Sequence, residues 1–166
     1  MSNQLINDIY KSRKTILDIL EERGFDTDDY NNFTYEELHT MIQNQQLDFM
    51  VKMRTGDKKV YVKYNVSKIL RPNNIHDYIE DLFLIENVLT KADDLIIINK
   101  DEPNDTMQTT IKNIWQNDQI YVSIVNIARL QFNILQHTLV PKHTVLLEAE
   151  RDKFLEKYNI TDIKQI

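Results

Sequence analysis

A strand, helix and strand pattern in the middle of the chain restricts the fold more than any other feature. Residues 95–98 form a short, continuous apolar run and residues 120–125 form a second one, as expected for strands buried on both faces. Between them, Thr106 caps a predicted helix. The apolar residues that this helix carries are Met107, Ile111, Ile114 and Trp115. Strands joined by such a crossover lie parallel, so the sequence predicts an α/β domain.

The residues before this unit predict helices and an antiparallel hairpin. Residues 4–23 have the spacing of an amphipathic helix, which ends at Gly24, where a left-handed cap favours glycine. Residues 26–32 are expected to be an acidic loop. Thr34 and Glu37 then form a capping box for a second helix.

Apolar and polar residues alternate over 47–54 and again over 60–66, with the turn residues 55–58 between them. This period of two predicts a two-stranded ribbon with one buried face, in which Met50 alone interrupts the polar side and Tyr61 is exposed.

Three more elements are expected towards the C-terminus. Asn74 is predicted to cap a helix over residues 75–89, with Glu86 on its inward side. The alternation of Leu130, Phe132 and Ile134 suggests a last strand. After Pro141 we expect a short strand at 144–147 and a helix at 148–158.

Composition excludes several classes of protein. The chain has 166 residues, 42% of them apolar and 28% charged, which fits a globular protein of about one domain. It contains no cysteine, so disulfides and thiolate metal sites are excluded. No apolar run approaches the about 20 residues that span a bilayer, and the N-terminus does not resemble a secretory signal. A net charge of −6 argues against a protein that binds nucleic acid unaided.

A search for catalytic chemistry finds one incomplete pattern. Asp48 on the first strand of the hairpin and Lys63 on the second resemble the carboxylate and lysine of metal-dependent nucleases. The residue two positions before Lys63 is Tyr61 instead of an acid, and the spacing Asp57-Lys58-Lys59 falls in the turn. We therefore expect no catalytic residue, no metal and no cofactor, with a metal-dependent, nuclease-like DNA-binding enzyme as an alternative.

Basic residues gather on the hairpin. They are Lys52, Arg54, Lys58, Lys59 and Lys63. Alternate residues of a strand share a face, so Lys52, Arg54 and Lys63 are candidates for one side, which would lie near nucleic acid phosphates. The other interpretation is an ordinary solvated strand face whose lysines prevent edge aggregation.

The segment that joins the two differently built regions carries the most specific motif. Residues 132–143 read Phe-Asn-Ile-Leu-Gln-His-Thr-Leu-Val-Pro-Lys-His. They resemble the junction Asn-Ile-Thr-His-His-Glu-Leu-Val-Pro-Lys-His in the family formed by the fifth subunit shared by eukaryotic nuclear RNA polymerases and its archaeal counterpart. His137 and residues 139–143 match, whereas Gln136 and Thr138 depart from the pattern. Residues 22–25 resemble a second, weaker family motif, Asp-Arg-Gly-Tyr.

The resemblance implies a non-catalytic subunit of a DNA-dependent RNA polymerase. Residues 1–135 would form an α/β, nuclease-like jaw domain with helices packed on a mixed sheet. Residues 136–166 would begin a small α+β assembly domain, which in the family continues further, so we expect the chain to be C-terminally short. The expected partners are the largest subunit, other polymerase subunits and, through the assembled enzyme, downstream DNA, with no membrane and no small-molecule substrate.

The resemblance and the apolar side of the last helix suggest a set of partner-binding residues. They are His137, Leu139, Val140, Pro141, Lys142, His143, Phe154, Leu155 and Tyr158. The divergence, and a composition rich in Asn, Ile, Asp and Lys, suggest a protist or a large DNA virus as the source. The expected location is the nucleus, or a cytoplasmic virus factory or virion if the source is viral. A stand-alone interaction adaptor remains a further alternative.

Overall fold

The computed structural model describes residues 3–141 and 148–158. The chain divides into two compact units, Met1–Asn133 and Ile134–Ile166. Their boundary lies close to the predicted one between residues 135 and 136, while the identification of the units as jaw and assembly domains remains a prediction. Among the described helices, none combines the length and apolar character that a membrane crossing requires.

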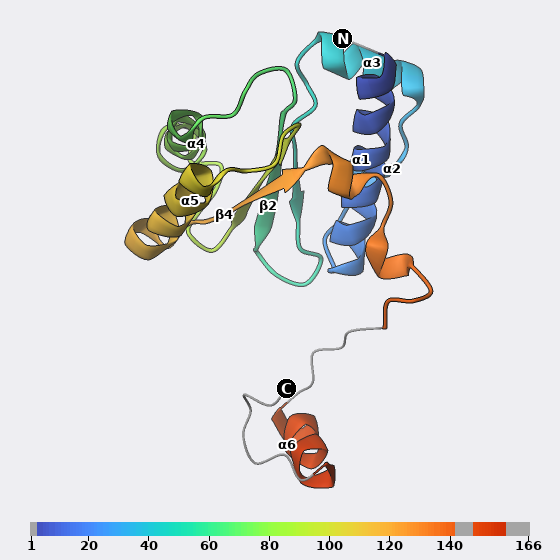
Figure 1. Ribbon diagram of the computed structural model, residues 1–166, viewed down its shortest axis with the longest axis vertical. Coiled ribbons are helices and arrows are strands. Elements are labelled where there is room, and N and C mark those ends of the chain that lie inside the picture. Colours follow the sequence, from blue (N-terminus) through green and yellow to red (C-terminus); the bar gives the residue numbers. More distant parts are fainter. Residues whose placement is uncertain (1–2, 142–147, 159–166) are drawn as a thin grey trace. The chain divides into compact units, whose positions relative to one another are not determined.

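A four-stranded sheet with the order β1-β2-β3-β4 forms the centre of the first unit (Figure 1). β1 (Phe49–Lys52) pairs antiparallel with β2 (Lys59–Asn65). β3 (Asp94–Asn99) pairs parallel with β2, and β4 (Tyr121–Asn126) pairs parallel with β3. The predicted hairpin, the parallel crossover and the α/β class with a mixed sheet are confirmed.

One face of the sheet is covered by α1 (Asn3–Glu22) and α3 (Tyr35–Gln43). Side chains from α1 such as Leu17 and Leu20 are buried against Val60 and Val62 of β2. A buried aliphatic side chain contributes roughly 1.5–3 kcal/mol of transfer free energy, so this layer stabilises much of the fold. Both predicted helix ends are confirmed, because Gly24 has a φ of +87° and the Thr34 capping box is formed.

The other face is covered by α4 (Pro72–Ile79), the π-helical segment η1 (Glu80–Ile85) and α5 (Asp105–Asp118) (Figure 1). The apolar run of β3 serves both layers, since Leu95 and Ile97 face these helices while Ile96 and Ile98 face α1. This two-sided burial is the physical reason for the continuous apolar sequence of β3.

Five details of the sequence interpretation are wrong, and the first three concern helices. The acidic loop at 26–32 contains a short helix, α2 (Asp28–Asn31). The helix expected at 75–89 begins at Pro72. Proline lacks a backbone N–H, which is tolerated at the first helical position because an N–H there has no partner within the helix. Glu86 lies beyond the end of η1 and is exposed. Asn104 instead of Thr106 caps α5, because its side chain accepts a 2.9 Å hydrogen bond from the Met107 N–H.

The last two concern apolar residues. The expected strand at Leu130, Phe132 and Ile134 is absent: two 3-10 segments, η2 (Ile127–Leu130) and η3 (Ile134–Gln136), take its place. The Asn126 side chain accepts from the Ala128 N–H and turns the chain, so Leu130 is buried beside Ile127. The hairpin also has no fully exposed face, because Met50 and Tyr61 pack against the layer of α4 and α5.

Candidate functional site

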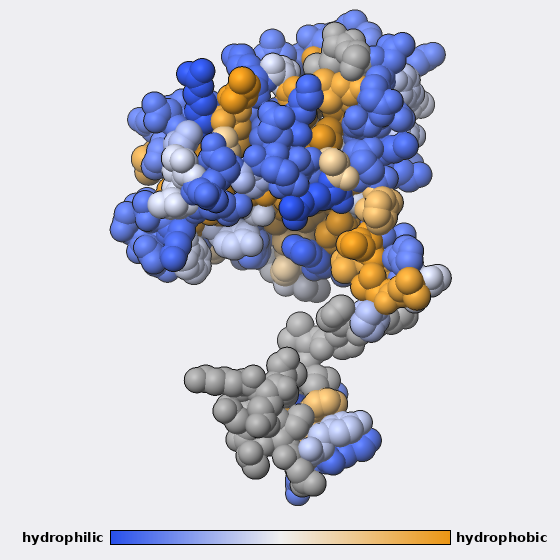
Figure 2. Space-filling view, in the orientation of Figure 1, coloured by the Kyte–Doolittle hydropathy of each residue, from blue (hydrophilic) through white to orange (hydrophobic). Residues whose placement is uncertain are grey.

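The junction of the second unit is a compact series of turns with exposed apolar side chains. After η3, the His137 N–H donates to the Ile134 carbonyl (3.1 Å), and the Val140 N–H donates to the His137 carbonyl (2.9 Å). The His137 ring also contributes, since its Nδ1 accepts from the Leu139 N–H at 3.2 Å. Leu139 is left 84% exposed, and Ile134 is exposed as well. Figure 2 shows apolar surface along this segment. The predicted residues Lys142 and His143 and the expected strand at 144–147 lie outside the described residues.

The predicted helix at 148–158 is confirmed as α6 (Glu148–Lys157). The Phe154 and Tyr158 rings lie one turn apart with centroids 4.6 Å from each other, and both are exposed. Leu155 is half-buried beside them. The aromatic pair gives α6 an apolar side that its own unit does not cover in the described residues.

Each of the five basic hairpin residues is held by an internal acceptor. The Nζ of Lys52 lies 2.9 Å from Asp57, that of Lys58 lies 2.8 Å from Asp94, and that of Lys63 lies 2.7 Å from Asp48. Lys59 donates to the Val88 carbonyl (3.1 Å), and Arg54 lies 3.0 Å from Asp28. The local acids therefore compensate most of the charge that the sequence suggested for a phosphate-binding surface.

The structure separates two of these cations. Lys63 lies on the side of α4, with its Nζ 4.8 Å from the centroid of the Tyr78 ring. The Arg54 guanidinium lies on the other side of the hairpin, among Asp28, Glu21 and Asp26. The predicted common face for Arg54 and Lys63 is wrong, because Arg54 follows the end of β1 and its N–H pairs with the Gly24 carbonyl.

Asp48 and Lys63 form a closed pair. One Asp48 oxygen accepts from Lys63, and the other accepts from the Tyr64 N–H at 2.8 Å. Burial alone would lower the pKa of Lys63, but the hydrogen bond and charge of Asp48 outweigh it and the pKa is raised. The described residues contain no group of three or more His, Asp or Glu side chains that could hold a metal ion. The nuclease interpretation gains no support from this geometry.

The carboxyl ends of the parallel strands, where α/β proteins commonly bind ligands, are filled by side chains. Asn65, Asn99 and Asn126 stand in register at the ends of β2, β3 and β4, and all three are buried. Asn65 donates to the Asn99 Oδ1 at 3.0 Å and accepts from the Tyr78 hydroxyl at 3.1 Å. These bonds give the buried side-chain amides their hydrogen-bond partners, so these asparagines stabilise the fold at this end of the sheet.

Comparison with known proteins finds similarity to subunits of RNA polymerases. Residues 132–165 match the family described as RNA polymerase Rpb5, C-terminal domain. The chain is 23% identical over 159 residues to DNA-directed RNA polymerases IV and V subunit 5B of Arabidopsis thaliana, covering 92% of this chain and 69% of that protein. It is 24% identical over 157 residues to DNA-directed RNA polymerases I, II, and III subunit rpabc1 of Dictyostelium discoideum, covering 95% and 77%.

An archaeal protein shows a shorter and stronger similarity. DNA-directed RNA polymerase subunit Rpo5 of Pyrococcus abyssi is 55% identical over 34 residues, which are 20% of this chain and 42% of that protein. The chain thus resembles the RNA polymerase subunit 5 family, and the low identities over its full length fit a divergent relative. The resemblance seen in the junction motif is thereby confirmed, because the matched proteins are named as subunits of DNA-directed RNA polymerases.

The family match at 132–165 includes all nine residues predicted for partner binding, although no observation tests their roles. Sequence reasoning missed a different surface feature of this subunit 5 relative. Trp115 was grouped with the apolar residues of α5 without assignment to a face; it is 48% exposed, and its ring centroid lies 6.3 Å from that of Tyr121. A signal was available, because Met107 and Ile114 define the buried line of the helix at a spacing of seven residues.

Proposed function

We propose that this protein is a non-catalytic subunit of a DNA-directed RNA polymerase that contributes to the lower jaw and to attachment of the largest subunit. In this proposal, residues 1–135 form the jaw near downstream DNA and residues 136–166 belong to the assembly domain. The observation that carries it is the family match at 132–165, which falls on a segment with exposed apolar side chains. We further infer a nuclear location, or a cytoplasmic virus factory or virion if the gene is viral.

The assembly surface consists of the nine residues predicted for partner binding. Leu139 and the rings of Phe154 and Tyr158 would supply apolar contact area to the partner. Their side chains are exposed, so they contribute little to the folding of the chain itself. Pro141 would fix the chain direction between the two parts, since its φ is locked and Val140 before it is restricted to extended conformations.

Contact with downstream DNA would arise through the assembled enzyme. The five hairpin cations are engaged with internal acceptors, so binding to phosphates would require exchange of these contacts. The separate protein, with a net charge of −6, is therefore expected to bind DNA weakly.

Co-expression with the largest polymerase subunit of the same organism tests the proposal. The affinity-tagged full chain should recover that subunit, identified by mass spectrometry. Leu139→Asp should reduce its recovery at least tenfold, and Pro141→Gly should reduce it while the first unit keeps its circular dichroism spectrum.

Ile69→Asp is the matched control for Leu139→Asp, because Ile69 is an aliphatic residue of the first unit with 71% of its surface exposed. This variant should bind like the wild type. Failure of the wild-type chain to recover the largest subunit would overturn the proposed function. Equal recovery by Leu139→Asp would remove the junction from the interface.

A further inference from the structure

The two edges of the sheet are protected to different degrees. The edge of β1 is covered by the chain after α1, because the Asp26 N–H donates to the Lys52 carbonyl and the Arg54 N–H donates to the Gly24 carbonyl. On β4, the other edge, no strand pairs with the outer side within the described part of the chain. An uncovered edge presents alternate backbone N–H and C=O groups to any extended chain.

The sequence of β4 has none of the side chains that usually protect such an edge. Residues 121–126 read Tyr-Val-Ser-Ile-Val-Asn, without a charged residue or proline, and they pair with β3 in unbroken register. Charged residues, prolines and bulges are the devices by which natural edge strands avoid pairing with other chains. The open edge of β4 is thus chemically suited to accept a strand.

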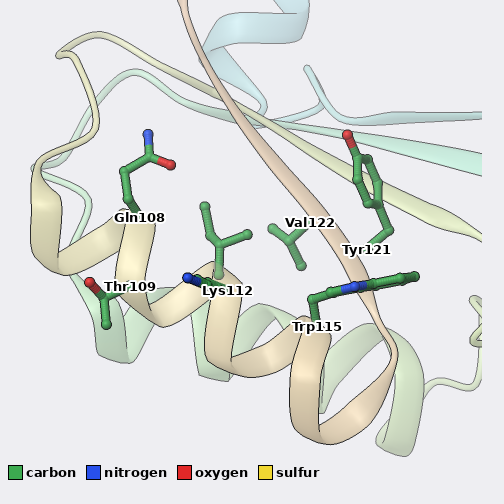
Figure 3. Close-up of a pocket in the computed structure, with 7 residues that line it drawn as sticks. Gln108, Thr109, Lys112, Trp115, Tyr121 and Val122 are labelled. Atoms are coloured by element: carbon green, nitrogen blue, oxygen red, sulfur yellow. The ribbon is translucent and has the colours of Figure 1, made fainter. Parts of the chain in front are cut away.

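An apolar groove runs beside this edge. It has a volume of about 630 Å³ and lies between α5 and β4 (Figure 3). Trp115 and Ile111 come from α5, and Tyr121 and Val122 come from β4. Figure 3 shows the Trp115 and Tyr121 side chains projecting toward the same hollow. Such a volume falls in the range of ligand-binding pockets in proteins.

The groove also carries one charge. Among the residues that the structure describes, Lys112 is the only charged one that lines it, and no acid stands three or four positions away on α5 to pair with Lys112. On a protein with a net charge of −6, this isolated cation favours an acidic group in whatever occupies the groove.

We propose that β4 and α5 form a docking site for an extended segment of a partner polypeptide. The segment adds a strand to the edge of β4, places apolar side chains from alternate positions in the groove against Trp115 and Tyr121, and directs an acidic side chain toward Lys112. The outer main-chain groups of β4 match the spacing of a peptide backbone in a strand, and the side chains of the groove then set specificity. This site is separate from residues 136–166 and does not depend on the proposed polymerase function.

Selection of peptides tests the proposal directly. A library of random 12-residue peptides displayed on phage is selected on the wild-type full chain, with Trp115→Ser protein in solution as competitor. Selected sequences should alternate apolar and polar residues and contain an acid. Trp115 is the only tryptophan of the protein, so binding of the best synthetic peptide should shift its fluorescence emission.

Backbone pairing is tested by N-methylating single amides of that peptide. Methylation at alternate positions should reduce affinity at least tenfold, and methylation between them should have little effect. Trp115→Ser should also reduce affinity at least tenfold, whereas Leu84→Ser, which alters an apolar residue 69% exposed outside the groove, should not. Lys112→Glu changes an exposed residue that does not support the fold, and it should shift the preference from acidic to basic peptides.

Three results would overturn the proposal. They are the absence of peptides that depend on Trp115, equal tolerance of N-methylation at every position, and an unchanged charge preference in Lys112→Glu. A concentration-dependent dimer of the wild type in sedimentation velocity, lost in Trp115→Ser, would assign the groove to a second copy of this chain instead. Because no polymerase subunit takes part in these measurements, their failure leaves the proposed function untouched.

Discussion

The two units of this protein differ in where their apolar side chains lie. In the first unit, Leu95, Ile97 and Ile98 are completely buried between two layers of helices. In the second, Leu139 is almost fully exposed, and no described side chain is fully buried. Apolar residues of the first unit are thus explained by folding. In the proposed function, those of the second unit would contact another polymerase subunit, and the family match falls on this segment.

The comparison also explains why similarity is distributed unevenly. Over most of the chain, identity to the plant and amoebal subunits is only 23% and 24%. A core accepts many combinations of apolar residues as long as volume and pattern are kept. Under the proposed function, the segment at 132–165 would be a surface that fits another subunit and so accepts fewer sequences, in line with the 55% identity to the archaeal subunit over 34 residues.

Truncating one apolar residue in each unit gives the largest expected contrast. Ile97→Ala removes a fully buried side chain between β3 and the α4 layer, and should lower the free energy of unfolding by about 2–5 kcal/mol. Leu139→Ala should change it by less than about 0.5 kcal/mol, because the side chain is already in water. Urea unfolding followed by circular dichroism measures both. Similar losses in the two variants would show that the second unit has a core of its own.

A smaller effect tests how well the first unit satisfies its buried polar groups. Asp93 is buried and accepts from the Lys59 N–H (2.6 Å) and from both the N–H and the hydroxyl of Thr90 (2.8 Å each). Asp93→Ala leaves these donors without an acceptor and should cost about 2–3 kcal/mol in urea unfolding. Asp101→Ala, at an exposed position, is the control and should be nearly neutral.

The same carboxylate predicts a pH dependence. Burial acts to raise the pKa of Asp93, but the hydrogen bonds from Thr90 and Lys59 prevail and hold it below 3.8. A lowered pKa in the folded state means that the contribution to stability is complete above the ordinary pKa and is lost as the pH falls through the folded value. The difference in stability between wild type and Asp93→Ala should therefore persist down to about pH 3.8 and shrink below it. A constant difference down to about pH 2 would contradict this assignment.

The smallest effect is expected at the surface of the hairpin. Arg54 is half exposed and its ion pairs with Asp28 and Glu21 are open to solvent. Arg54→Ala should change the free energy of unfolding by no more than about 0.5 kcal/mol. Fluorescence anisotropy with a DNA duplex should detect only weak binding by the separate wild-type protein and little change in the variant. Tight binding that Arg54→Ala abolishes would show that the internal ion pairs open easily for phosphates.

Much of the first unit was predictable because local patterns and tertiary burial agree there. The continuous run at 95–98 could only be a doubly buried strand once a helix and a second such run followed it. The Thr34 capping box and the Gly24 cap depend on neighbouring residues alone, and both are correct. The expected strand through Phe132 failed because alternation over three positions is also compatible with short 3-10 turns, and the Asn126 cap decided between them.

The candidate sites likewise divide into features that local sequence predicted and features that only tertiary contacts set. The junction motif around Leu139 was found in the sequence because adjacent residues carry it, and the family relationship it suggested is confirmed. The hairpin cations were recognised individually, but their partners were not. Asp94 lies 36 positions beyond Lys58, so only the pairing of β2 with β3 brings the two side chains together.

By itself, the sequence determined the periods of its elements, the caps of two helices, the α/β class and the resemblance to a polymerase subunit family, since each of these depends on residues close together in the chain. Only the tertiary structure decided which charges are neutralised and which apolar residues stay in contact with water. Helix packing brings Trp115 and Tyr121 together as the lining of a groove, and strand order leaves β4 as an open edge. Neither feature could be read from the residues next to them in the sequence, because both depend on contacts between distant parts of the chain.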